Sequence, residues 1–107
     1  MSDDATLKQR AAELQTWVAV HPLDSLAWTA LSQTQERIGQ PLRAIRADAE
    51  SRVALGDLNG AADRLRAGQR RARSGAVDFI DVSVIDARLR DVEVLRKQSE
   101  ADQKQFR

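Results

Sequence analysis

The sequence predicts an all-α fold, a single domain built from about five antiparallel helices. Of its 107 residues 42% are hydrophobic, and only two are proline and five glycine, a composition that favours helices. Apolar residues recur at spacings of three and four, and the pattern is interrupted mainly at glycine or proline turns. We therefore expect one helical domain over residues 1–107, with helices at about 4–20, 25–38, 41–55, 58–74 and 77–99.

The first helix is predicted to begin after an N-cap at Asp3 or Asp4. It should end at His21, because the residue before Pro22 is disfavoured in the helical region. Its buried face is marked by apolar residues at helical spacing, namely Leu7, Ala11, Leu14, Trp17 and Val18.

The second helix should start after Asp24 or Ser25 and stop at Gly39, a typical C-terminal glycine. Pro41 suits the first turn of the third helix, where a missing N–H is harmless. That helix should end at Gly56.

The fourth helix is rich in arginine and carries small residues on one side. Gly68 in its middle costs up to about 1 kcal/mol relative to alanine, so we expect a close helix–helix approach there. Ser74 and Gly75 should end the helix.

The stretch 77–85 is rich in β-branched residues, and propensity alone would make it a strand. Its apolar residues, however, continue at helical spacing through Leu89 to Leu95, and a lone strand would have no partner. We therefore expect a helix, with a polar, frayed tail beyond Ser99.

Side chains at the apolar positions of these helices are expected in the core, namely Trp17, Trp28, Leu31, Ile45, Leu65, Ile85 and Leu89. Further structural roles are expected for Gly39, Gly56, Ala61 and Gly68.

The segment Pro22–Leu31, with a Pro–Asp turn followed by Trp28, is succeeded by Gly39 and Ala44, and then by a Gly56–Asp57 turn followed by Ala61 and Leu65. This pattern resembles the tetratricopeptide repeat. The resemblance implies a right-handed array of helix pairs that binds proteins and performs no chemistry. It also suggests that the chain is a fragment of a longer array.

A narrower resemblance is carried by the segments 46–50, 54–57, 61–65, 78–79 and 85–89. They are similar to the C-terminal repeat domain of bacterial periplasmic HExxH zinc metallopeptidases, the beta-barrel-assembly-enhancing protease group. The resemblance implies a noncatalytic module that recruits substrate or outer-membrane assembly partners. It would place zinc and catalysis in another part of the parent protein.

The chain itself offers no catalytic or metal constellation. It contains no HExxH motif and no cysteine, and its single histidine, His21, precedes a proline in a turn. Among the acidic residues of the last helix, Asp78 is expected to cap it, and Asp81 and Asp86 to face solvent. We therefore expect no enzyme activity and no cofactor in this chain.

Charge is segregated along a chain of net charge +1. Residues 37–73 hold nine arginines against four acidic residues, a net of +5, whereas residues 3–36 and 78–102 each carry −3. Pairing between the acidic last helix and the arginine-rich fourth helix is the simplest account. An acidic protein partner or, as an alternative function, a nucleic acid bound by the fourth helix would also use this charge. The near-zero total charge and the 4% aromatic content argue against nucleic acid.

Partner-binding candidates are the polar residues that the core does not need, because the concave face of a repeat array binds partner segments. They are Gln33, Gln35, Arg37, Arg46, Arg52, Arg66, Arg70 and Arg73. A protein or peptide partner is expected, and a stand-alone helical adaptor is the alternative to a peptidase module.

No run of the sequence has the roughly 18 apolar residues of a membrane span, so none is expected. No export leader opens the printed sequence, and an exported parent would make this chain a part of it. The compartment is predicted to be periplasmic if the family resemblance holds, and cytoplasmic otherwise.

Overall fold

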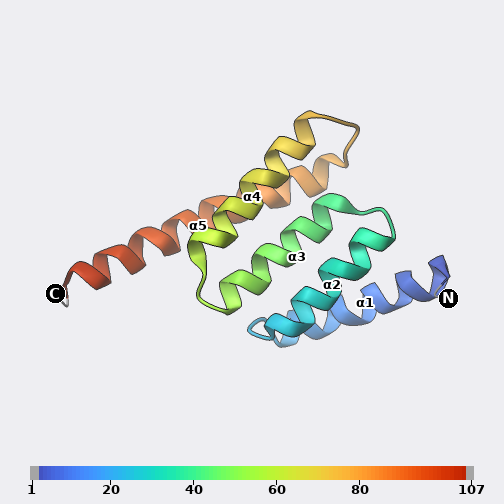
Figure 1. Cartoon of the computed structure of the whole chain (residues 1–107), viewed down its shortest axis with the longest axis horizontal. Coiled ribbons are helices and arrows are strands. Elements are labelled where there is room, and N and C mark those ends of the chain that lie inside the picture. Colours follow the sequence, from blue (N-terminus) through green and yellow to red (C-terminus); the bar gives the residue numbers. More distant parts are fainter. Residues whose placement is uncertain (1–2, 106–107) are drawn as a thin grey trace.

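The computed structural model describes residues 3–105, and all regular structure in that range is α-helical. Consecutive helices run antiparallel and each packs against the one before it (Figure 1). The helices are α1 (Asp4–Val20), α2 (Ser25–Arg37), α3 (Pro41–Ala54), α4 (Leu58–Arg73) and α5 (Phe79–Gln105). The predicted all-α fold of about five helices is confirmed, and 77–85 contains no strand.

Aspartate side chains cap the starts of α1, α2, α4 and α5, whereas α3 begins at Pro41 without a side-chain cap. Asp3, Asp24 and Asp57 each accept a hydrogen bond from the backbone N–H three residues on, at 2.8, 3.0 and 2.9 Å. Asp78 accepts from the Ile80 N–H at 2.7 Å, as expected for the start of α5. Gly39 and Gly56, at φ 76° and 79°, occupy the left-handed region that ends α2 and α3.

Two apolar clusters form the core, and α3 contributes to both. The larger joins α3, α4 and α5 through Leu42, Ala49, Ala61, Ala62, Leu65, Ile85 and Val92. The smaller joins α1, α2 and α3 through Val18, Trp28, Leu31 and Ala47. Helix α3 therefore holds the two halves of the molecule together.

Gly68 lies at a close approach of α4 to α3 and α5. A Cβ atom added there would be 2.9 Å from Ile85 Cδ1 and 3.2 Å from Ile45 Cγ2. The expected close approach is thus present, and it explains a helix-interior glycine that propensity disfavours.

Trp17 is not a core residue, and its predicted burial is wrong. Its side chain is 49% exposed, lies against the His21 ring at 4.0 Å between centroids, and donates from Nε1 to Asp24 Oδ2 at 2.8 Å. The indole N–H thus links α1 to the turn that follows it. The neighbouring Val18 is the residue buried in the core. Ile45 and Leu89, also predicted as core, are only partly buried.

Helix α5 is longer than predicted, since it continues to Gln105 instead of fraying after Ser99. Its last turns project beyond α4 (Figure 1). Arg96 pairs there with Glu93 at 2.9 Å and with Glu100 at 3.3 Å, at the spacings that support an exposed helix.

Charge pairing within the domain is present but not confined to α4 and α5. Arg66 of α4 pairs with Glu93 of α5, as expected. Helix α5 also reaches α3, since Arg88 contacts Glu50 at 2.8 Å and Arg43 contacts Asp81 at 3.1 Å. The expectation that Asp81 and Asp86 face solvent is wrong, because Asp81 is paired and Asp86 accepts from Gln69 Nε2 at 2.9 Å.

Candidate functional site

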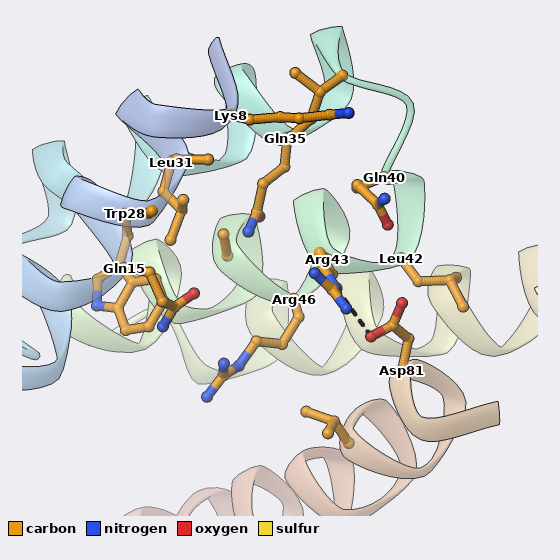
Figure 2. Close-up of a pocket in the computed structure, with 15 residues that line it drawn as sticks. Lys8, Gln15, Trp28, Leu31, Gln35, Gln40, Leu42, Arg43, Arg46 and Asp81 are labelled. Atoms are coloured by element: carbon orange, nitrogen blue, oxygen red, sulfur yellow. Dashed lines mark hydrogen bonds and ion pairs between the residues drawn. The ribbon is translucent and has the colours of Figure 1, made fainter. Parts of the chain in front are cut away.

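One hollow of the molecule is a groove of about 470 Å³ between α1 and α3, with α2 as its floor. The first turns of α5 close one end, and α4 contributes nothing to the lining. Figure 2 shows the lining side chains. A volume of this size is typical of small-ligand and peptide-side-chain sites.

The groove floor is apolar and rigid. Leu31 is fully buried beneath it, and Trp28 is 6% exposed with its Nε1 donating to the Pro22 carbonyl at 2.9 Å. The guanidinium of Arg46 lies 5.4 Å from the Trp28 ring centroid, within cation–π range. These contacts fix the floor in one arrangement.

Gln35 supplies a polar group at the centre of the groove. Its side chain extends from α2 into the space between Trp28 and Arg43 (Figure 2), and the residue is 7% exposed. The amide oxygen Oε1 is shielded from solvent and has no hydrogen-bond partner. Buried polar atoms are nearly always paired, so this one marks a place where a partner is missing.

Cations stand along the α1 and α3 walls. Lys8 of α1 pairs with Asp4 at 3.7 Å, and both side chains are largely exposed. Arg43 of α3 donates from Nε to Asp81 Oδ1 across the end of the groove at 3.1 Å, where Asp81 is 14% exposed. Figure 2 shows this contact as the link between α3 and α5.

Arg46 is the less well satisfied of the two groove arginines. Its Nε lies 3.3 Å from Glu50 Oε2 but makes no hydrogen bond. Arg88 occupies that carboxylate through three hydrogen bonds of 2.8 to 3.0 Å. Two guanidinium groups therefore compete for one carboxylate.

The predicted partner-binding residues are spread over several surfaces, and the structure brings only Gln35 and Arg46 into the groove. Gln33 and Arg37 line a second hollow of about 730 Å³ between α1 and α2. Arg52 pairs with Asp48 and Asp57 at 3.5 and 3.6 Å.

The remaining candidates lie on α4. Arg66 pairs with Asp63 at 3.2 Å as well as with Glu93. Arg70 and Arg73 make no ion pair within residues 3–105.

Several groove residues were not predicted from the sequence, namely Lys8, Gln15, Gln40, Arg43 and Asp81. Some of them carried a usable signal. Arg43 precedes Arg46 by three residues, so the two share a helix face, and Lys8 and Gln15 share a face at a spacing of seven. No sequence pattern marked Asp81 as a groove residue, because its position depends on how α5 packs against α3.

Resolved pKa shifts fall outside the groove. Hydrogen bonds from the Trp17 indole N–H and then the Ala27 backbone N–H hold the pKa of Asp24 below its ordinary value. A hydrogen bond from Arg96 lowers the pKa of Glu93, and the same contact raises the pKa of Arg96. The backbone N–H of Thr6 lowers the pKa of Asp3. These shifts belong to helix caps and ion pairs that stabilise the fold.

Across residues 3–105, no group of three or more His, Cys, Asp or Glu side chains is placed to hold a metal ion. Within the same range, no helix combines the length and apolar character required to cross a membrane.

The structure thus shows a five-helix domain with a groove between α1 and α3. No protein-family model, no curated protein and no solved structure gives a significant match to this chain.

Proposed function

We propose that this chain is a noncatalytic protein-interaction domain that holds a segment of a partner protein in the groove between α1 and α3. The observation that carries the proposal is the combination of an apolar floor with the unpaired, nine-tenths-buried amide of Gln35. A cleft that is open, largely apolar and provided with a few oriented polar groups is the usual form of a binding site.

The succession of antiparallel helices, each packed against the one before it, supports a tetratricopeptide-like arrangement. We propose that the array is right-handed, in keeping with the sequence resemblance.

A wider proposal concerns the parent protein. We propose that the domain is the C-terminal repeat module of a periplasmic zinc metallopeptidase and recruits its substrates or assembly partners. This rests on the sequence resemblance alone. The coding sequence upstream of Met1 tests it: an export signal and an HExxH motif are expected, and a stop codon directly upstream would contradict it.

The binding proposal is tested by filling the groove. Ala12 is exposed on α1 and lines the groove, whereas Ala19 is exposed on the same helix outside it. Peptides would be selected from a random library on the wild-type domain, and their affinities measured by fluorescence anisotropy. Ala12→Phe should weaken binding about tenfold or more, and Ala19→Phe by less than about twofold.

Circular dichroism and thermal unfolding would verify that both variants fold. The proposal fails if no peptide is enriched, or if the two phenylalanine variants bind with equal affinity.

One observation favours the nucleic-acid alternative. Arg70, Arg71 and Arg73 lie close together at the end of α4 without an ion pair in the described range. Titration with generic double-stranded DNA at increasing salt discriminates. Submicromolar affinity that falls steeply with salt would favour nucleic acid over protein as the partner.

A further inference from the structure

Two polar atoms in the groove lack hydrogen-bond partners, and one is an acceptor whereas the other is a donor. Three buried side-chain atoms are unpaired within residues 3–105: Gln35 Oε1, Arg46 Nε and Arg64 Nε. Arg64 Nε lies 2.6 Å from Asp48 Oδ2, so its charge is neutralised there. The other two belong to groove residues, one an acceptor and one a donor.

The electrostatic balance of the groove favours an anionic ligand. Among the charged residues that line it, three cations, Lys8, Arg43 and Arg46, stand against one carboxylate, Asp81, a net of +2. Glu50 is already saturated by Arg88, which leaves Arg46 without an acceptor of good geometry. A ligand carboxylate would supply that acceptor.

The floor and Gln35 narrow the class of ligand further. A primary amide carries both a donor and an acceptor, and so does each peptide group of an extended chain. A helical ligand offers free backbone N–H groups only in its first turn. Inorganic phosphate or a nucleic-acid backbone would leave Gln35 Oε1 unpaired and the accessible apolar lining at Ala12, Ile38 and Val84 uncovered.

Asp81 occupies the position that a ligand carboxylate would take. It holds Arg43 at 3.1 Å from the first turns of α5, and Val84, one turn later, completes the apolar lining. Arg43 is half exposed and accessible from the groove side. Asp81 is therefore an internal competitor for the ligand.

Building on the proposed function, we propose that the groove binds an extended peptide in which acidic and apolar residues alternate. Its carboxylates take Arg43 from Asp81 and supply the acceptor that Arg46 lacks, and a peptide group pairs with the Gln35 amide. Successive side chains of an extended strand point to opposite sides, so apolar residues face the floor and acidic ones point toward the open rim, where the long side chains of Arg43 and Arg46 are partly exposed.

The test compares two fluorescein-labelled peptides of equal length, one alternating Glu with Leu or Val, the other Lys with Leu or Val. Wild type should bind the acidic peptide at least about tenfold more tightly than the basic one. Arg43→Gln and Arg46→Gln should each weaken acidic-peptide binding about fivefold or more. Asp81→Asn should strengthen it about threefold, because the competitor loses its charge.

The expected gain in affinity of Asp81→Asn distinguishes competition for the ligand from a general loss of structure, since an unfolded variant cannot bind more tightly. Millimolar inorganic phosphate and a generic DNA duplex should not displace the acidic peptide. Equal affinity for the two peptides, weaker binding by Asp81→Asn, or displacement by phosphate or DNA would overturn the proposal.

The outcome also distinguishes this inference from the proposed function. Library peptides that lose affinity with Ala12→Phe but show no acidic preference would leave the groove as a binding site and reject only its acidic ligand.

Discussion

The two tryptophans differ in burial although both fall at helical spacing with apolar neighbours. Trp28 is enclosed by the smaller cluster, whereas Trp17 lies on the surface against His21. Trp28→Ala should lower the free energy of unfolding by about 3–5 kcal/mol, and Trp17→Ala by less than about 1 kcal/mol. Urea denaturation monitored by circular dichroism measures both. Similar losses at the two positions would show that the burial described for Trp28 is wrong.

The unpaired amide oxygen of Gln35 is predicted to lower the stability of the domain and to contribute to peptide binding. Replacing it with methionine keeps the length of the side chain and removes the unpaired oxygen. Gln35→Met should therefore raise the free energy of unfolding by about 1 kcal/mol while weakening peptide binding. Thermal unfolding and anisotropy give the two readouts. A destabilised variant with unchanged affinity would mean that the amide has a structural role.

The Asp24 carboxyl should make part of the stability depend on pH. Its pKa is lowered in the folded state from an ordinary 3.8, so its contribution is present above that value and is lost as pH falls through the lower folded pKa. Asp24→Asn retains a capping side chain without the charge. We expect it to be less stable than wild type at pH 7 and to approach wild type near pH 2.

Urea midpoints at neutral and acidic pH measure this difference. Asp102→Asn is a suitable control, because Asp102 is exposed on the projecting end of α5. A deficit of Asp24→Asn that stays constant over the whole pH range would contradict the linkage.

At the scale of the element, helix starts and stops were readable from the sequence because they depend on local chemistry. Aspartate caps and two left-handed glycines set most boundaries within one residue. The length of α5 was not readable, because apolar periodicity ends at Leu95 whereas the helix continues on exposed charge pairs such as Arg96 with Glu100. The spacing of apolar residues indicates which part of a helix contacts the core, and it does not indicate how long the helix is.

Because α4 packs against α5, substitutions at Gly68 and Ile85 are predicted to have coupled effects on the free energy of unfolding. Alanine at position 68 gains up to about 1 kcal/mol in helix propensity, but its Cβ would press on Ile85 Cδ1. The change should therefore be more favourable in an Ile85→Val background, which lacks that methyl, by at least about 0.5 kcal/mol. A double-mutant cycle from urea denaturation measures the coupling. Additive effects of the two substitutions would show that α4 and α5 are less close than described.

At the scale of the molecule, the candidate site depends on contacts that no local pattern encodes. The Arg43–Asp81 pair joins residues 38 apart in sequence, and the α1 wall faces α3 across α2, which packs against both. Gln35 and Arg46 were predicted as binding residues only in the sense that they are polar and the core does not need them. The same prediction also included six residues that lie elsewhere, because exposed polarity alone does not reveal which surfaces face each other.

The central claim, that a partner segment lies between α1 and α3, is tested most directly by amide chemical-shift mapping of the ¹⁵N-labelled domain with the acidic peptide. We expect saturable shifts concentrated at Ala12, Gln35, Arg43, Arg46 and Asp81, with little change on α4. Shifts centred on Arg70 to Arg73, or spread evenly without saturation, would contradict it.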